Sequence, residues 1–334
     1  MKLADRSIEE HETLGHNNEM SSDIVLRDYK PIILVTGCSS GVGLALAHLL
    51  YKLPQYKTVV TARRLSLARL RNVFEENSHF KILDLDVLST HSRNKTLNTI
   101  ETTWGSVDIL INNAGISYRS VVEHMSEDDE QKQMYTNYFG PMALTRHILP
   151  TMREKGRGKI INVSSVSGML AMPTMASYSA SKHALEGASE ALWYEMKPFG
   201  INVSLIQPGF IHSQSFENVY YSENSEKGLD DPTQAYSDVY HSMAPFIAKL
   251  MKFSWTTPEH VAKKIIQTIQ KENPPLWVPA TPDAVLFYLF RRLLPRRWLM
   301  PVLFLLLPNS KKWAERHTYR RDSVGQLNRK KKSA

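Results

Sequence analysis

The sequence predicts an α/β fold: a doubly wound parallel sheet of about seven strands with helices on both faces. Short apolar segments of strand length alternate along the chain with longer segments of helical pattern. The strand segments are apolar almost throughout, as expected of strands that are buried on both faces of a sheet. No linker or internal repeat divides residues 31–280, so we expect them to form one domain.

Strands and helices are expected to alternate along this domain. The strands lie at residues 32–35, 58–61, 80–85, 107–111, 159–163, 202–207 and 276–278. Helices are expected near residues 44–53, 67–75 and 92–102, and another begins at Thr257-Pro258-Glu259. This strict alternation favours parallel strands joined by helical crossovers.

A glycine-rich segment, Thr36-Gly37-Cys38-Ser39-Ser40-Gly41-Val42-Gly43, lies between the first expected strand and a helix. A dinucleotide-binding fold needs glycine in this turn, both for the turn itself and for close approach of the backbone to the pyrophosphate. The spacing T-G-x-x-x-G-x-G differs from G-x-G-x-x-G, but its place between a strand and a helix supports the same role. The segment predicts a Rossmann-type nucleotide site, in which Cys38, the single cysteine, is a small loop residue.

The end of the second expected strand bears on the choice of cofactor. A carboxylate there would bind the ribose 2′-OH of NAD, whereas an arginine would tolerate the 2′-phosphate of NADP. The segment Thr61-Ala62-Arg63-Arg64 contains two arginines and no acid, which favours NADP(H). The alternative is that both arginines begin a solvated helix, because Arg69 and Arg71 continue the basic run.

Tyr178 and Lys182 are four residues apart and lie on the same face of an expected helix. The ammonium group would favour the phenolate and lower the pKa of Tyr178 from its reference of about 10. A tyrosine tuned in this way is a usable proton carrier. With Ser165 thirteen residues upstream, the pair points to a nicotinamide-dependent oxidoreductase.

In combination these residues resemble the short-chain dehydrogenase/reductase family over residues 31–280. Further motifs of the resemblance are Asp86-Val87, Asn112-Asn113-Ala114-Gly115, Asn137 and Pro208-Gly209. The resemblance implies interconversion of a carbonyl and an alcohol by hydride transfer with NADP(H). It also implies a homodimer or homotetramer, paired through the helices that contain Asn137 and Tyr178.

The resemblance implies a role for each catalytic residue. Tyr178 is the acid or base, and Ser165 holds and polarises the substrate oxygen. Lys182 binds the nicotinamide ribose, and Asn137 holds a water in the proton relay. The residues implied along the cofactor are Thr36, Gly37, Ser39, Ser40, Gly41, Val42, Gly43, Arg63, Arg64, Asp86, Val87, Asn113, Ala114, Gly115, Tyr178, Lys182, Pro208, Gly209, Ile211 and Ser213.

The net charge of +8 is concentrated at the C-terminal end. Residues 291–334 hold thirteen Lys or Arg against Glu315 and Asp322, a net charge of +11 that leaves −3 for the preceding residues. This distribution favours an anionic lipid surface or an acidic partner. No nucleic-acid-binding motif accompanies it, so no nucleic-acid partner is expected.

Residues 281–334 form an extension that is apolar and then basic. Its apolar blocks, 285–290 and 298–307, are separated by arginines and broken by prolines, and no apolar stretch reaches the roughly 18 residues of a membrane span. They fit a segment that lies on a membrane or covers the active site, with packing onto the soluble body as an equal alternative. Lys331 and Lys332 occupy the positions of a dilysine retrieval signal, although a plain basic tail is the simpler interpretation. We therefore expect a cytoplasmic protein, with attachment to a membrane surface as one alternative, which in a eukaryote would be that of the endoplasmic reticulum.

Residues 210–255 should form the substrate loop. Its large side chains either line a site for an apolar substrate or pack the loop onto the body. They are Phe216, Tyr220, Tyr221, Tyr236, Tyr240, Met243, Phe246 and Phe253. We expect a lipophilic substrate of steroid, retinoid, sphingoid or acyl type. The alternatives are a 3-oxoacyl or 3-ketosphinganine type reductase, and a non-catalytic NADP-binding regulator recruited by its basic tail.

Two further expectations concern the rest of the chain. Residues 1–30 form a polar leader that has no apolar run of signal-peptide length, and we expect it to be disordered. The twelve histidines form no His-x-x-x-His or His-Cys cluster, so we expect no metal site.

Overall fold

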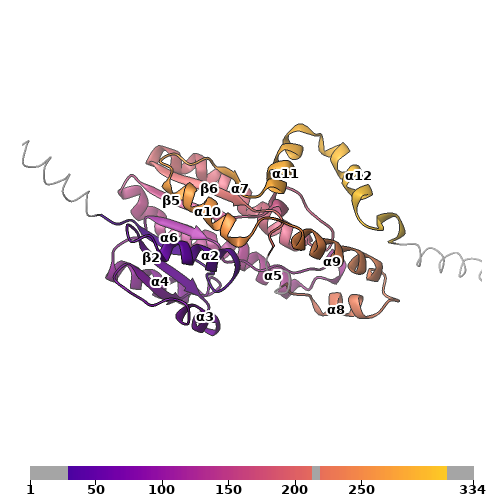
Figure 1. The fold of residues 1–334 in the computed structure, drawn as a ribbon, viewed down its shortest axis with the longest axis horizontal. Helices are drawn as coiled ribbons and strands as arrows, with labels where there is room; N and C mark the ends of the chain where they lie inside the picture. Colours follow the sequence, from indigo (N-terminus) through magenta and orange to yellow (C-terminus); the bar gives the residue numbers. More distant parts are fainter. Residues whose placement is uncertain (1–28, 213–218, 314–334) are drawn as a thin grey trace, which may run out of the picture.

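The computed structural model describes residues 29–212 and 219–313. Seven parallel strands form one sheet in the order β3-β2-β1-β4-β5-β6-β7. They are β1 (Ile32–Val35), β2 (Lys57–Ala62), β3 (Phe80–Asp84), β4 (Ile109–Asn112), β5 (Gly158–Val163), β6 (Ile201–Gln207) and β7 (Trp277–Pro279). The predicted doubly wound α/β fold is confirmed, and Figure 1 shows the helices that cover the sheet.

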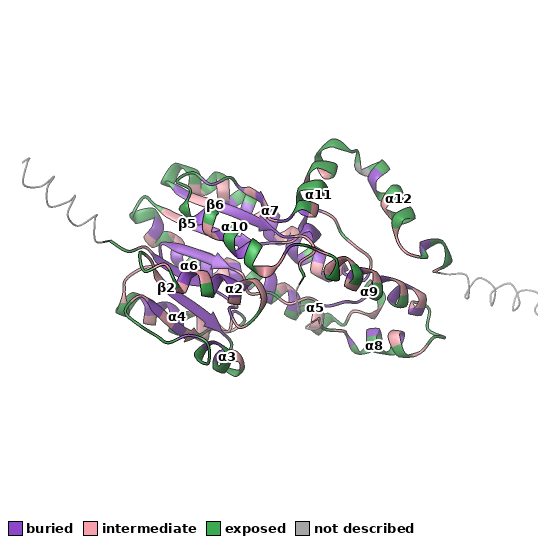
Figure 2. Ribbon diagram, viewed as in Figure 1, coloured by how far each residue is buried: buried purple, intermediate pink, exposed green. Residues whose placement is uncertain are grey.

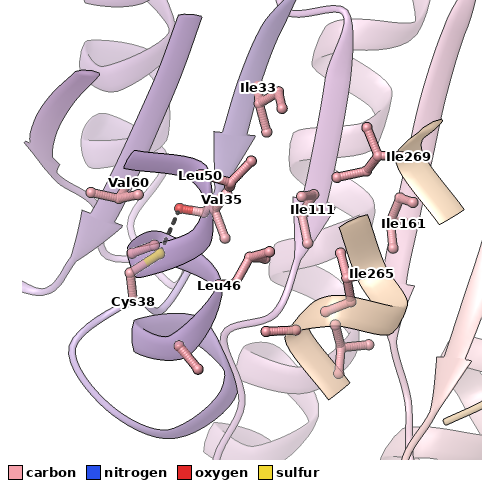
Figure 3. Close-up of a cluster of buried hydrophobic side chains, with 14 of the residues drawn as sticks. Ile33, Val35, Cys38, Leu46, Leu50, Val60, Ile111, Ile161, Ile265 and Ile269 are labelled. Carbon is pink, nitrogen blue, oxygen red and sulfur yellow. Dashed lines mark hydrogen bonds between the residues drawn. The ribbon is translucent and has the colours of Figure 1, made fainter. Parts of the chain in front are cut away.

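The sheet separates two hydrophobic cores. Helices α2 (Gly41–Tyr51), α3 (Leu67–Arg71) and α10 (Pro258–Gln270) pack on one face, and α4 (Thr90–Thr103), α6 (Gly140–Glu154) and α7 (Ala176–Met196) pack on the other. Successive strand residues point to opposite faces, so Ile33 belongs to the first core and Leu34 to the second. Figure 3 shows the first core, where side chains of α2 and α10 meet those of the central strands. Burial on both faces explains why the strands are apolar throughout.

Helix α3 is shorter than the predicted helix at residues 67–75, since it ends at Arg71. The backbone N–H of Phe74 still donates to the carbonyl of Leu70 at 2.9 Å, which closes the last turn. The ring of Phe74 then turns into the core, with its centroid 5.3 Å from that of Phe80. The predicted helical residues after Arg71 are therefore not helical, and Phe74 among them packs in the core.

The remaining elements lie mostly beyond the carboxyl ends of the strands. They are η1 (Arg64–Ser66), η2 (Val122–His124), α5 (Glu127–Met134), η3 (Tyr135–Phe139), η4 (Val166–Gly168), η5 (Lys197–Phe199), α8 (Glu223–Asp230), α9 (Ser237–Lys252), α11 (Pro282–Leu293), α12 (Arg296–Leu306) and η7 (Ser310–Lys312). In Figure 1, α8 and α9 lie together at one end of the molecule, and α11 and α12, in yellow, arch beside them.

Helix α11, at the start of the predicted C-terminal extension, is bound to the body at both ends. Thr281 Oγ1 accepts from Gly209 N at 2.9 Å, and the Asp283 carboxylate accepts from Phe210 N at 2.8 Å. At the other end, Arg291 donates to the carbonyl of Gly168 at 3.3 Å. Within the described ranges, no helix has both the length and the apolar character required to cross a bilayer.

Candidate active site

A cavity of about 480 Å³ contains residues from every predicted motif except Asn137. It lies at the carboxyl ends of β1 and β4, where the strand order reverses, which is the usual ligand site of an open parallel sheet. The predicted residues that line it are Gly37, Ser39, Ser40, Val42, Gly43, Arg63, Asp86, Val87, Asn113, Ala114, Gly115, Ser165, Tyr178, Lys182, Pro208, Gly209 and Ile211. These predicted residues extend from Gly37 to Ile211 in the sequence and thus share one site.

Four predicted residues, Thr36, Gly41, Arg64 and Asn137, are not among those that line the cavity. Ser213 lies outside the described residues. Arg64 begins the short turn η1 on the surface, so of the two arginines at the end of β2 only Arg63 reaches the cavity.

The glycine loop is held against the loop that comes after β4. Asn113 Nδ2 donates to the carbonyl oxygens of Thr36 and Gly37 at 3.0 and 2.9 Å, and Thr36 Oγ1 accepts from Asn113 N at 3.0 Å. Gly37 has φ +71°, a left-handed conformation that favours glycine. A Cβ on Gly43 would meet the carbonyl oxygen of Gly37, so the helix can approach the loop this closely only without a side chain.

The N-terminus of α2 suits a phosphate, because no protein group competes for it. No acidic residue lies in its first turn, and the N-cap residue Ser40 makes no side-chain capping bond. A helix N-terminus carries partial positive charge and unpaired N–H groups, which suit an anion. The glycine cradle and this helix end therefore fit the pyrophosphate of a dinucleotide. Cys38 is fully buried beneath the loop and burial raises its pKa to about 12, so its thiol is a packing group (Figure 3).

Ser165, Tyr178 and Lys182 line the cavity together. Ser165 lies just after β5 and its Oγ accepts from the backbone N–H of Ser167 at 3.1 Å, which fixes the hydroxyl. A hydrogen bond links Ser165 to Tyr178, which lies in the first turn of α7. Lys182 lies one turn later, and its Nζ donates to the carbonyl of Val163 at 2.8 Å. Ser165, Tyr178 and Lys182 therefore lie together at one site.

The pKa values of this pair differ from the sequence prediction. Burial raises the pKa of Tyr178, and the hydrogen bond with Ser165 lowers it in part. Lys182 makes no comparable contribution, because its Nζ bonds to Val163 and lies 5.8 Å from the centroid of the tyrosine ring. Burial also lowers the pKa of Lys182, to about 8, against the opposing charge of Glu186. Spacing on a helix places the two groups correctly but says nothing of their desolvation.

Glu186, one turn beyond Lys182, is a buried carboxylate that no sequence motif indicated. Its Oε1 accepts from Ser164 Oγ at 2.7 Å and from Gln207 Nε2 at 2.9 Å. Its Oε2 lies 3.8 Å from the guanidinium of Arg291 on α11. Burial raises the pKa of Glu186, and these three partners lower it. Helix α11 thereby contacts the residues behind Lys182.

Asn137 lies in a π-helical turn, a feature frequent at functional sites. Its side chain is fully buried and bonded within the protein: Nδ2 donates to Ile116 O and to Ser181 Oγ, both at 2.9 Å, and Oδ1 accepts from Ile116 N at 2.9 Å. Asn137 therefore holds the loop after β4 against α7. Its predicted role in a water relay stays a prediction.

Several cavity residues were absent from the sequence prediction. Ser66 and Arg69 line the cavity with Arg63, although the basic run containing Arg69 also fits a plain solvated helix. Arg119 and Lys132 line it beside Tyr220: the N–H of Arg119 donates to the carbonyl of Tyr220 at 2.8 Å, and Lys132 Nζ lies 5.6 Å from its ring centroid. Arg119 lies in a loop and Lys132 on α5, and a single cation in either place forms no motif that spacing could indicate.

Several of the large residues in the substrate loop pack on the body and do not line the site. Of the seven that the structure describes, Tyr220 lines the cavity; Phe216 lies outside the described residues. Tyr240 is buried, with its hydroxyl accepting from Val121 N at 3.1 Å, and Met243 is fully buried in a small core. Apolar residues that line the cavity and that no motif indicated include Met172, Met175, Phe210, Val219, Ile247 and Met251.

Comparison with known proteins agrees with this geometry. The family model described as short chain dehydrogenase matches residues 31–224. The chain belongs to the short-chain dehydrogenase/reductase family. This confirms the resemblance and, at this level, an oxidoreductase.

Individual relatives carry different names. A dehydrogenase/reductase SDR family protein 7-like of Drosophila melanogaster is 33% identical, over 84% of this chain and 82% of the relative. A 3-ketodihydrosphingosine reductase of Bacteroides thetaiotaomicron is 34% identical, over 73% and 85%. Retinol dehydrogenase 8 of Bos taurus is 34% identical, over 75% and 81%. A short-chain dehydrogenase structure from Streptomyces avermitilis matches with a TM-score of 0.66 and 31% identity, over 77% of this chain and 90% of that one.

Proposed function

We propose that this protein is an NADP(H)-dependent oxidoreductase that interconverts a carbonyl and an alcohol on a lipophilic substrate, with Tyr178 as acid or base. The observation that carries the proposal is that Tyr178, Ser165 and Lys182 line the same cavity as the glycine loop. The nicotinamide cofactor would supply or accept the hydride. The residues of the chain bind, orient and handle the proton.

The proton chemistry favours reduction near neutral pH. Because burial raises the pKa of Tyr178, its phenol is protonated there and can donate to a developing alkoxide. Ser165, fixed by its bonds to Ser167 and Tyr178, can donate to or hold the same substrate oxygen. Lys182 uses one N–H on Val163 and, as a cation, has two more for the cofactor ribose.

The preference for NADP(H) rests on the charges around the cavity. Arg63, Ser66 and Arg69 line it close to the end of β2, where a carboxylate would be needed to bind the ribose of NAD. Asp86 is the single carboxylate among the described residues that line it. Two guanidinium groups and a hydroxyl suit a 2′-phosphate.

The substrate class is inferred from the rest of the lining. The six apolar residues Met172, Met175, Phe210, Val219, Ile247 and Met251 suit a lipophilic molecule. The cations Arg119 and Lys132 would repel an ammonium group, so we place neutral or acidic lipids, such as steroids, retinoids and acyl chains, ahead of sphingoid bases. The name of the Bos taurus relative supports a retinoid.

A 3-ketosphinganine-type reductase is the second candidate. It is supported by the name of the Bacteroides thetaiotaomicron relative and opposed by the two cations. A non-catalytic regulator is the third, although such a protein has no use for an assembled Ser165, Tyr178 and Lys182. Turnover assays on neutral, acidic and amino lipids distinguish all three.

Replacing Tyr178 with Phe tests the proposal directly. We expect NADPH binding, measured by energy transfer from tryptophan to nicotinamide, to persist, and turnover of a panel of ketosteroids, retinals and 3-ketoacyl compounds to fall by a factor of about 10²–10⁴. Tyr194→Phe, an exposed tyrosine on the same helix, is the matched control. Unchanged turnover in Tyr178→Phe would refute the catalytic assignment, and tight binding without turnover by the unaltered protein across the panel would favour the regulator.

A further inference from the structure

Helices α11 and α12 expose many large apolar side chains. We call these residues the outer face: Val285, Leu286, Leu289, Phe290, Leu293, Leu294, Trp298, Met300, Val302, Phe304, Leu305 and Leu306. Leu293 is 75% exposed and Leu306 is 69% exposed. In Figure 2 both helices are largely green, in contrast to the purple strands of the sheet. So many exposed large apolar side chains on two consecutive helices indicate an interaction site.

The outer face is held in place by contacts at both ends of the arch. At one end Ala284 is fully buried against Val166 and Met169. At the other end Leu307 and Trp313 pack against the cluster of α9 that contains Met243 and Ile247. Ala284, Leu307 and Trp313 therefore attach the arch to the body, whereas the side chains of the outer face remain exposed to solvent.

The charges around the outer face indicate which kind of surface it suits. Residues 281–313 contain a single acid, Asp283, whose carboxylate accepts from Phe210 N. The bases of the same segment include Arg292, Arg297, Lys311 and Lys312, all exposed. Apolar side chains bordered by cations are the pattern of a helix that lies in an anionic lipid interface. Trp298, with the guanidinium of Arg297 5.2 Å from its ring centroid, has the amphipathic character of an interfacial anchor.

Length excludes insertion across a bilayer by these helices. Helix α12 has 11 residues with Pro301 inside it, whereas a span needs about 20. A second copy of the chain is the competing occupant. Because the cations border the apolar residues on both copies, a pair of outer faces would bring like charges together.

We propose that the outer face docks on an anionic phospholipid surface and holds the substrate cavity beside the lipid. Ile247 and Met251 of α9 line the cavity, and Ile247 belongs to the cluster on which the end of α12 packs. A lipophilic substrate would then pass between lipid and cavity over a short path. The docking is inferred from the exposed residues of the outer face alone, whereas the passage of substrate from lipid to cavity rests on the proposed function.

Vesicle sedimentation tests the docking without cofactor or substrate. The full chain is mixed with phosphatidylcholine vesicles that contain phosphatidylserine, and with vesicles of phosphatidylcholine alone. We expect binding to the anionic vesicles, at least about tenfold weaker in the double variant Leu293→Asp/Leu306→Asp. Leu65→Asp, which replaces a 98% exposed leucine of η1, outside the outer face, should bind like the unaltered protein. Brominated acyl chains should quench fluorescence in the unaltered protein and less so in Trp298→Phe.

Three results would overturn the proposal. The first is failure of the unaltered chain to bind anionic vesicles. The second is equal binding by the double variant, which would assign the attraction to charge alone. The third is conversion of an oligomer to a monomer by the double variant with vesicle binding unchanged, which would place a second copy on the outer face. Thermal melts of the variants confirm folding, and turnover of a detergent-dispersed substrate reports on the proposed function separately.

Discussion

At the scale of single residues, Glu186 opposes the effect of burial on the pKa of Lys182, which is about 8. Glu186→Gln keeps the shape and an acceptor oxygen but removes the charge, so the pKa of Lys182 should fall further. The ammonium group of Lys182 would then lose its proton at a lower pH than in the unaltered protein. If turnover needs that cation, the alkaline limb of kcat/KM should move to lower pH by about one unit, with activity well below pH 8 retained.

The control for this change is Glu190→Gln, an exposed glutamate on the same helix. Its pH profile should match that of the unaltered protein. Coincident profiles for both variants would show that Glu186 does not act through Lys182. A uniform loss of activity at every pH in Glu186→Gln would instead indicate a packing defect.

Arg69 provides a test of cofactor choice. If Arg69 binds the 2′-phosphate, Arg69→Ser removes one charge-assisted hydrogen bond worth about 1.5–3 kcal/mol, so the Kd for NADPH should rise by about tenfold or more. NADH lacks the phosphate, and its Kd should stay nearly constant. Arg71→Ser, an exposed arginine two positions on that does not line the cavity, is the control. Equal weakening of both cofactors in Arg69→Ser would contradict the assignment.

The residue scale also shows what spacing can and cannot predict. The helical period placed Tyr178 and Lys182 on one face, and the strand–glycine–helix order located the phosphate loop, because both depend on local geometry. The raised pKa of Tyr178 and the selection of Arg63 over Arg64 depend on surroundings contributed by distant segments. Those segments come together only in the folded protein, so residue spacing could not predict either property.

At the scale of elements, the start of α11 fixes the loop after β6. Asp283→Ala would leave the N–H of Phe210 without its acceptor, a cost of about 1–3 kcal/mol in the free energy of unfolding. Because Gly209 and Phe210 line the cavity, NADPH should also bind more weakly. Denaturant unfolding and cofactor titration measure both effects.

Two variants control that measurement. Asp283→Asn retains an acceptor oxygen and should recover most of the stability, whereas Asp231→Ala, just beyond the end of α8, should not weaken NADPH binding. Stability in Asp283→Ala equal to that of the unaltered protein would mean that the loop does not depend on α11.

The predicted strands agree with the observed ones within two residues at each end, because a run buried on both faces is continuous in the sequence. Helix α3 was predicted too long because its last residues satisfy a helical pattern but Phe74 is drawn into the core. The substrate loop was ambiguous for a related reason: residues such as Tyr240 are large and apolar whether they line a cavity or pack beneath it.

At the scale of the whole molecule, α11 and α12 connect regions that the sequence separates. Arg291 lies 3.8 Å from Glu186, one turn beyond Lys182, and Leu307 packs on the cluster of α9 beside the cavity. The homodimer or homotetramer implied by the resemblance stays a prediction; exposed Tyr135 and Tyr194 lie on η3 and α7, the helices implied to pair.

Two truncations test how far the catalytic unit extends. A chain that ends at Ala280 loses Thr281, Asp283 and Arg291, so the N–H groups of Gly209 and Phe210 lose their acceptors. It should bind NADPH at least about tenfold more weakly, since two hydrogen bonds at the cavity wall are lost together.

A chain that ends at Leu294 is the matched comparison, because it keeps all three residues and removes only residues 295–334, with α12 among them. Cofactor binding should persist in it, while the KM for a lipophilic substrate rises because Leu307 and Trp313 no longer cover the cluster of α9. Cofactor titration and steady-state kinetics separate the two effects. Full NADPH affinity in the chain ending at Ala280 would show that the site is complete without α11, and unchanged KM in the longer chain would show that α12 has no part in holding the substrate end of the cavity.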